Sequence, residues 1–141
     1  MGQLVEGVWI KNKDLATSDN KGAFQRPDSG FREGVGKNHL RFQPEKNRYH
    51  LYVSYACPWA HRALIFRELK GLLGVIGVSV VHPHMLDEGW TFETDFDGAT
   101  GDLVNDKKLM YEIYQEADPK VSSRVTVPVL WDQKEQTIVN N

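Results

Sequence analysis

The stretch YHLYVSYACPWAHRALIFRELKGLL, residues 49–73, decides the fold because its pattern predicts a strand, a sharp turn and a helix. Aromatic and β-branched residues dominate its first positions, with Leu51 and Val53 on one face. From residue 60 to residue 73 the apolar side chains follow helical spacing. Pro58 cannot continue a strand interior, but it suits the first position of a helix. We therefore expect a strand that leads directly into a helix.

The only cysteine of the chain, Cys57, lies in this turn, immediately ahead of the expected helix. Unpaired backbone N–H groups and the helix dipole favour negative charge at such a position. They favour the reactive thiolate over the thiol. A lone cysteine is more often a small buried apolar residue, but a purely structural cysteine has no reason to lie at the tip of a helix. We interpret Cys57 as a sulfur nucleophile at the carboxyl end of a strand.

Length and composition set the broad class. The 141 residues suffice for one domain, and the 40% hydrophobic content supports a packed core. A formal net charge of −2 without a basic run gives no reason to expect nucleic acid or an anionic membrane surface as a partner. The sequence has no apolar run of about 18 residues and no signal-peptide pattern. One cysteine cannot form an internal disulfide, which fits a reducing compartment, so we expect a cytoplasmic protein.

Residues 1–48 are interpreted as an extended N-terminal arm. Scattered glycines and the turn signals at residues 26–30 disfavour regular structure there. The aromatic content of the arm disfavours a disordered tail. We expect the arm to lie on the body and to be anchored by its apolar side chains, which are Val8, Trp9, Ile10, Phe24, Phe31 and Phe42.

After the central helix, residues 75–81 form a short apolar run typical of a strand buried on both faces. With the first strand and the helix, this run makes a right-handed βαβ unit. The long loop that follows, residues 82–105, is of a length that is usually functional or mobile. Asn105 or Asp106 is then expected to cap a helix that runs to Ala117.

Two strands, residues 125–131 and 137–139, are expected to close the chain as a β-hairpin. Pro128 interrupts the first, so it marks an edge, a bulge or a cis peptide. Two parallel strands plus a hairpin make the four-stranded mixed sheet of a thioredoxin-like α/β domain, which we assign to residues 49–141. That fold closes with a further helix. The sequence stops at Asn141, so we expect an apolar sheet face with little cover, which favours association.

The motif Cys57-Pro58-Trp59-Ala60 has alanine where dithiol redox enzymes carry a second cysteine. A mixed disulfide on Cys57 must therefore be resolved by an external thiol, and in the cytoplasm we expect that thiol to be glutathione. Such a tripeptide needs a backbone partner and a cation for its carboxylates. A cis bond before Pro128 would leave the backbone of Val127 free to pair with it.

Two further side chains are candidates for this ligand site. Arg124 can make a charge-assisted contact to a carboxylate, although a solvated arginine at a strand end is an equal alternative. Trp90 lies in the long loop, on the edge where α/β sheets bind ligands, and its alternative is a place in the core. His61 is either a base for Cys57 or a surface residue. We expect no metal site, because the loop cluster His82, His84, Asp87 and Glu88 lacks helical spacing.

Five blocks of the sequence resemble one family, and they are RPDSGFR at residues 26–32, YHLYVSYACPWAHRALIFRELKGL at 49–72, IGVSVVHPHMLDEGWTF at 76–92, YEIYQEADPKVSSRVTVPVLWD at 111–132 and TIVNN at 137–141. This set is similar to the glutathionyl-hydroquinone reductases, also called Xi-class glutathione transferases. The resemblance implies the N-terminal, thioredoxin-like domain of a glutathione transferase.

The activity that the resemblance implies is the reduction of glutathionyl-hydroquinones to hydroquinones. Cys57 would attack the glutathione sulfur, and the Cys57–glutathione mixed disulfide would be resolved by a second glutathione. No metal is implied. The glutathione contacts that carry over are Trp90, Arg124, Val125, Thr126 and Val127, ahead of a structural cis-proline at Pro128.

Members of the family continue beyond the asparagine pair at residues 140–141. A closing helix follows there, and then an all-helical domain with the hydroquinone pocket and the homodimer surface. We expect both to be absent here and the isolated chain to be weakly active or inactive, because catalysis requires both reactants to be positioned. Two alternatives stay open, a non-catalytic glutathione-binding module and a monothiol, glutaredoxin-like enzyme that acts on protein mixed disulfides.

Overall fold

A four-stranded sheet forms the centre of the computed structural model, which describes residues 2–11, 17–18, 22, 24–25 and 29–141. The strand order is β6-β5-β8-β9. β5 pairs in parallel with β6 and antiparallel with β8, and β8 pairs antiparallel with β9. The expected mixed sheet is thus confirmed. Its strands are β5 (Tyr49–Val53), β6 (Gly77–Val80), β8 (Val129–Asp132) and β9 (Thr137–Asn140).

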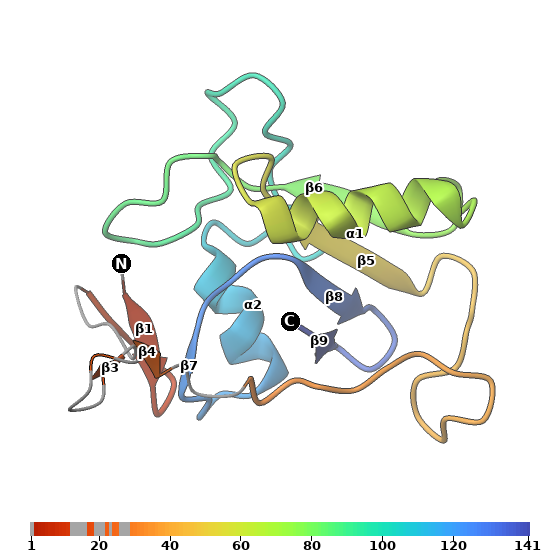
Figure 1. Ribbon diagram of the computed structural model, residues 1–141, viewed down its shortest axis with the longest axis horizontal. Helices are drawn as coiled ribbons and strands as arrows, with labels where there is room; N and C mark the ends of the chain where they lie inside the picture. Colours follow the sequence, from red (N-terminus) through yellow and green to blue (C-terminus); the bar gives the residue numbers. More distant parts are fainter. Residues whose placement is uncertain (1, 12–16, 19–21, 23, 26–28) are drawn as a thin grey trace.

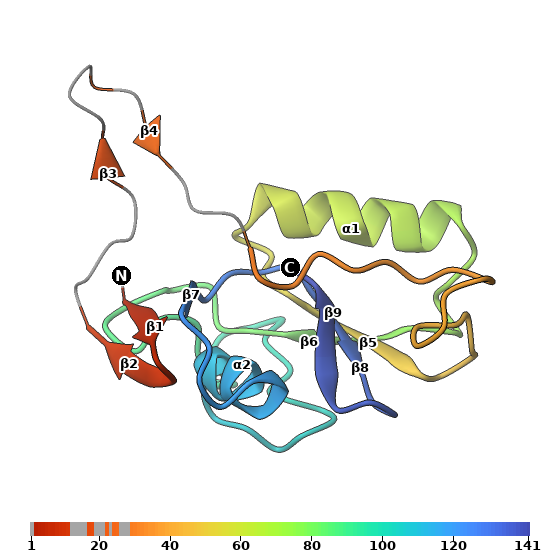
Figure 2. The same cartoon turned by 90° about the horizontal axis from the view of Figure 1, so that it is seen from below.

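Two helices cover opposite faces of this sheet, as Figure 2 shows, and they are α1 (Pro58–Leu69) and α2 (Met110–Ala117). On the α1 face, Ala60 packs against Leu51 and Val53 of β5. On the α2 face, Tyr52 and Trp131 belong to one buried cluster with residues of α2. The alternation along β5 therefore fills both layers of the core. None of the helices in the described part of the chain is long and apolar enough to span a membrane.

Both ends of α1 follow from its sequence. Cys57 is the N-cap and Pro58 occupies the first helical position, as expected. Leu73 was expected to continue the helical spacing, but the helix ends at Leu69. Gly71 has φ +66°, and the N–H groups of Gly71 and Leu72 donate to the carbonyls of Glu68 and Arg67. This Schellman motif ends the helix before the last two leucines.

The strand expected at residues 75–81 is shorter than predicted, and only its second half is buried on both faces, where the neighbouring residues Ser79 and Val80 are both buried. β6 begins at Gly77, which is exposed, and Val78 is only half-buried. The strand begins only where its pairing with β5 begins, with Gly77 opposite His50. The βαβ unit of β5, α1 and β6 is nevertheless confirmed, with parallel pairing from His50–Gly77 to Val53–Val80.

α2 begins later than predicted. The expected caps, Asn105 or Asp106, belong instead to a turn held by Asp102, whose carboxylate accepts backbone N–H groups of residues 104, 105 and 107, and Asp106 has φ +54°. The N-cap is instead Leu109. Glu112 accepts the Leu109 N–H at 2.8 Å, which is the carboxylate half of a capping box. The end of α2 at Ala117, ahead of Asp118, is as predicted.

Residues 125–131 do not form one strand. β7 (Ser123–Arg124) pairs with the N-terminal segment, whereas β8 starts only at Val129, after a cis Val127–Pro128 peptide bond. Pro128 has no N–H for a sheet ladder, so it separates the two pairings. Residues 125–128 therefore run as an irregular segment between two sheets.

The N-terminal part is more regular than predicted. It contains two short hairpins, and β1, which Figure 1 shows beside β7, pairs with β7 as well as with β2, so that the first hairpin extends into a three-stranded sheet, β2-β1-β7. The hairpin strands are β1 (Gln3–Val5), β2 (Val8–Ile10), β3 (Thr17–Ser18) and β4 (Phe24–Gln25).

The expected anchors of this part divide into three groups. Phe42 is buried, and Trp9 and Phe31 pack against the main core cluster, as expected. Val8 and Ile10 were expected to anchor as well, but they are 59% and 37% exposed, because both lie on the outer face of β2. The Phe24 side chain and the turn signal at residues 26–28 lie outside the described features. The domain boundary after residue 48 stays a prediction.

The face of the sheet beside α1 carries an apolar groove of about 350 Å³. Its walls include Leu51, Phe66, Ile76 and Leu130. Such a groove fits the expectation of an incompletely covered sheet face. That it promotes association stays a prediction.

Candidate functional site

Cys57 lies where β5 passes into α1. Its backbone N–H donates to the Ser54 carbonyl at 3.1 Å, which closes the turn that begins after Val53. Its carbonyl accepts the His61 N–H at 3.0 Å, the first intrahelical bond of α1. The side chain is half-buried, and its thiol donates to the Val127 carbonyl oxygen at 3.3 Å. The sulfur therefore faces the irregular segment ahead of β8.

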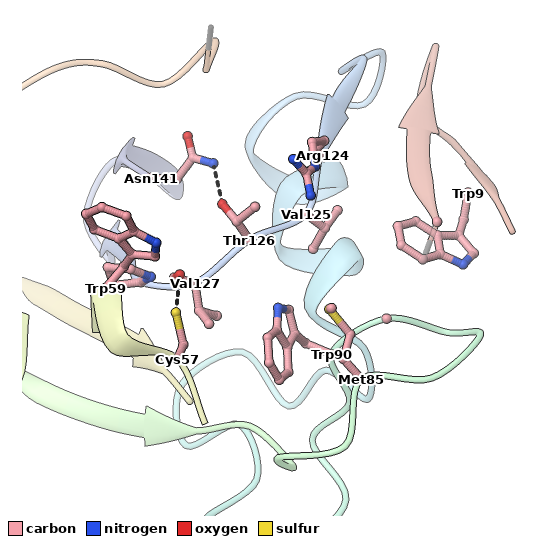
Figure 3. Close-up of a pocket in the computed structure, with 13 residues that line it drawn as sticks. Trp9, Cys57, Trp59, Met85, Trp90, Arg124, Val125, Thr126, Val127 and Asn141 are labelled. Atoms are coloured by element: carbon pink, nitrogen blue, oxygen red, sulfur yellow. Dashed lines mark hydrogen bonds between the residues drawn. The ribbon is translucent and has the colours of Figure 1, made fainter. Parts of the chain in front are cut away.

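A pocket of about 440 Å³ opens beside this sulfur, within the usual range of roughly 300–1,000 Å³ for small-ligand sites. All seven residues that the sequence singled out for the ligand site line it, and Figure 3 shows most of them around one space. They are Cys57, Trp90, Arg124, Val125, Thr126, Val127 and Pro128. The structure thus brings them together, and their roles in binding and catalysis stay predictions.

The segment around Thr126 is held from two sides. The Thr126 N–H donates to the Tyr114 hydroxyl at 3.1 Å, and that hydroxyl donates back to the Thr126 carbonyl at 3.0 Å. The side-chain amide of Asn141 donates to the Tyr114 hydroxyl at 2.6 Å and to the Thr126 hydroxyl at 3.3 Å. Val125 and Val127 bury their side chains in the core. Their backbone is consequently fixed along the pocket wall, where a peptide-like ligand can pair with it.

Trp90 combines the two interpretations that the sequence left open. It is 9% exposed and belongs to the main core cluster, yet it also lines the pocket. Its carbonyl accepts the N–H of Met110, the first residue of α2. Arg124 is half-buried at the end of β7, and Figure 3 shows its side chain on the same space as Trp90. Within the described residues the structure records no ion pair for Arg124, so its charge can serve an anionic group.

Several residues of the pocket were missed by sequence reasoning. Trp59 could have been found, because it directly follows Cys57-Pro58 and carries a large exposed aromatic ring. The others come from segments that only the tertiary structure brings together, and they are Gly2, Trp9, Met85, Gly89 and Asn141.

The histidine candidates lie away from this pocket. His61 is exposed and does not line it. The rings of His82 and His84 pack edge-to-face against each other, at 5.1 Å, and against Phe96. Among the residues that the structure describes, no group of three or more histidine, cysteine or acidic side chains is arranged to hold a metal ion.

A buried polar network fixes the long loop behind the sheet. His50 is buried and bonds Ser79 through its Nε2 at 2.8 Å. The Tyr52 hydroxyl donates to Asp102 at 3.0 Å and accepts from Asn105 at 2.9 Å. Burial lowers the pKa of His50 to about 4, so the ring is neutral at physiological pH. The same cause raises the pKa of Tyr52 far above its ordinary value.

Comparison with known proteins places these features in context. Residues 56–141 match the family model of the glutathione S-transferase N-terminal domain. The sequence is 52% identical over 148 aligned residues to the glutathionyl-hydroquinone reductase YqjG of Escherichia coli (strain K12), and the match covers 100% of this chain and 45% of that protein.

Solved structures of glutathione transferases also match this chain. A Xi-class glutathione transferase from Natrialba magadii matches with a TM-score of 0.85 at 49% identity, over 100% of this chain and 41% of the other. The glutathione-bound structure of YqjG matches with a TM-score of 0.83 at 48% identity, over 99% and 42% of the two chains. The chain thus spans less than half the length of these proteins.

Proposed function

Because the chain belongs to the glutathione S-transferase N-terminal domain family, with matches among glutathionyl-hydroquinone reductases and Xi-class transferases, we propose that it binds glutathione and uses Cys57 as its nucleophile. The observation that carries this proposal is the Cys57 sulfur at 3.3 Å from the Val127 carbonyl, inside the pocket that Arg124 and Trp90 also line. A thiol tripeptide fits such a pocket, because its sulfur, its backbone N–H groups and its carboxylates can each meet one of these groups.

Each part of glutathione has a partner in this proposal. The ligand sulfur lies at Cys57, and an N–H of the ligand backbone takes the Val127 carbonyl that the thiol otherwise bonds. A ligand carboxylate pairs with Arg124, and such charge-assisted hydrogen bonds are the strong ones. The ring of Trp90 and the backbone of Val125 and Thr126 bound the ligand between these ends.

The proposed reaction is the reduction of a glutathionyl-hydroquinone. The Cys57 thiolate attacks the glutathione sulfur of the thioether, the carbon–sulfur bond breaks, and the aryl carbon takes the electron pair and a proton to give the hydroquinone. A second glutathione thiolate then attacks the Cys57–glutathione disulfide and leaves as oxidised glutathione, which restores the Cys57 thiolate. Overall, the sulfur of the thioether and the sulfur of the second glutathione each lose one electron and the aryl carbon gains two, so the electrons balance. Ala60, one helical turn from the nucleophile, offers no competing thiol.

We also propose that the hydroquinone pocket and a homodimer contact lie in the part of the related proteins that this chain does not match. A cytoplasmic location completes the proposal. It fits a nucleophile that must stay reduced.

A second candidate is the removal of glutathione from protein mixed disulfides by a monothiol mechanism. It is favoured by one observation, that the nucleophile and every proposed glutathione contact lie within this chain. A protein mixed disulfide would then need no separate aromatic pocket.

Single turnover tests the leading proposal. The chain in molar excess is mixed with glutathionyl-menadiol, and hydroquinone release is measured together with the mass of the protein. We expect one hydroquinone released per glutathione attached to Cys57, and neither product with Cys57→Ser. Attachment of glutathione from a glutathionylated peptide, without hydroquinone release from the thioether, would favour the second candidate instead.

A further inference from the structure

The N-terminal hairpin reaches the pocket through one side chain, Trp9. Its indole stacks on Tyr111 of α2, with ring centroids 4.8 Å apart and planes 18° from parallel. Trp9 also lines the pocket, together with Gly2, which directly precedes β1. Figure 3 shows Trp9 on the far side of Arg124 and Trp90 from Cys57. The hairpin is therefore a wall of the site as well as an addition to the fold.

Trp9 also holds the loop that carries Trp90. Its indole N–H donates to the Asp87 carbonyl at 3.2 Å, at the tip of a tight turn closed by the Gly89 N–H on the Leu86 carbonyl. Gly89 has φ +71°, and a methyl group on it would lie 3.1 Å from the Trp9 ring, so indole and turn are in direct contact. Trp90 is the next residue.

Two other contacts tie the same hairpin to the site. Lys11, which directly follows β2, forms an ion pair with Glu88 of the turn. On the other edge, β1 pairs with β7 in a register that sets Gln3 opposite Arg124. The hairpin thus touches both elements that supply side chains to the distal half of the pocket, the loop with Trp90 and the strand with Arg124.

We propose that Trp9 is a positioning residue of the glutathione site, which fixes the turn at residues 86–89 and thereby sets Trp90 against the ligand. This inference rests on the proposed function, because it assumes that the pocket takes glutathione. Trp9 lies at the end of the pocket opposite Cys57, so it acts on binding and not on the reactivity of the sulfur.

The test compares two reactions of Cys57 in the full 141-residue chain. Oxidised glutathione must occupy the pocket before it forms the mixed disulfide, whereas iodoacetamide alkylates the thiol without a binding site. We expect Trp9→Ala to lower the second-order rate of glutathionylation about tenfold and to leave alkylation within twofold of the wild type. Trp9→Phe keeps a ring on Tyr111 but loses the N–H to Asp87, and we expect it to show an intermediate, about threefold, loss of the glutathionylation rate.

Val8→Ala is the matched control, because Val8 lies on the same strand with its side chain exposed and outside the pocket. It should change neither reaction. Equal glutathionylation of Trp9→Ala and the wild type overturns the inference, as does an equal loss of both reactions. If Trp9→Ala does not fold, Trp9→Phe decides alone, by a threefold loss confined to glutathionylation. A wild-type chain that alkylates but is never glutathionylated refutes the proposed function itself.

Discussion

The Cys57 thiol and the Val127 carbonyl oxygen meet across 3.3 Å, although the two residues lie 70 positions apart in the chain. They meet because Cys57 lies in the turn after β5 and Val127 precedes β8, and these two strands are antiparallel neighbours with Tyr52 opposite Val129. The central sheet therefore brings a nucleophile and a peptide-binding edge to the same place. Neither segment forms this arrangement alone.

Arg124 is predicted to give the pocket its preference for an anionic ligand. Arg124→Ala should slow glutathionylation of Cys57 by oxidised glutathione about tenfold or more, because a hydrogen bond between charged groups contributes about 1.5–3 kcal/mol. Reaction with the neutral 2-hydroxyethyl disulfide should stay within twofold. Rates are followed by intact-protein mass spectrometry.

Arg62→Ala is the matched control for that prediction. Arg62 is also cationic and near Cys57 in sequence, but it does not line the pocket itself, and its guanidinium lies over the ring of Trp59. If Arg62→Ala slows the reaction as much as Arg124→Ala does, general positive potential explains the effect and the specific contact is refuted.

His50 is predicted to make stability depend on pH between about 6.5 and 4. Burial lowers its pKa to about 4 in the folded chain, so the unfolded chain binds a proton first as pH falls from the ordinary value of 6.5. The free energy of unfolding should fall over this window, by up to about 1.4 kcal/mol per pH unit. Urea unfolding at a series of pH values measures it. In His50→Gln that contribution should vanish, and identical slopes for the two proteins would contradict the assignment.

The buried ion pair between Arg48 and Asp132 is predicted to be essential for stability. Arg48 donates to both carboxylate oxygens of Asp132, which is fully buried and also caps the turn between β8 and β9. Arg48→Met leaves that carboxylate without its partner and should cost about 3–5 kcal/mol. Arg41→Ala breaks the exposed pair with Glu135 and should cost less than about 1 kcal/mol. Urea unfolding measures both losses of unfolding free energy. Equal losses for the two variants would show that the burial of an ion pair does not determine its contribution to stability.

Gly71 is predicted to be required for the C-terminal end of α1. At φ +66° a side chain is strained, so Gly71→Ala should cost about 1 kcal/mol even though its methyl group would meet no atom within 4 Å. Gly74 has equal space and no positive φ, so Gly74→Ala is the control and should be close to neutral. Thermal unfolding distinguishes them, and a neutral Gly71→Ala would refute the Schellman interpretation.

The parts of the fold that sequence could predict are those set by local pattern. The β5–α1–β6 unit follows from alternation, from Pro58 at the start of a helix and from one apolar run. Cys57 at the N-cap follows from the same residues. The late start of α2 was missed because Asp102 uses its carboxylate to hold residues 104–107 in a turn, which takes the cap away from Asp106.

The parts that could not be predicted depend on pairings distant in the chain. β7 exists because β1 pairs with it, more than a hundred positions away. Residues 125–131 have the pattern of one strand, but only residues 129–131 pair in the central sheet, and residues 125–128 are the irregular link between β7 and β8. Trp9 had no local signal for the pocket, because its partners, Tyr111 and Asp87, come from α2 and the long loop. The candidate site was nevertheless largely predictable, since Cys57 and the segment before Pro128 both carry their signals in short motifs.

The most direct measurement of the central claim is the mass of the chain after incubation with oxidised glutathione, followed by peptide mapping. The sulfur of Cys57 should displace one glutathione thiolate and form one mixed disulfide, so we predict one glutathione per chain, located on Cys57 and removed by excess reduced glutathione. A chain that stays unmodified under these conditions, while iodoacetamide still alkylates Cys57, would contradict the claim that this pocket presents glutathione to that sulfur.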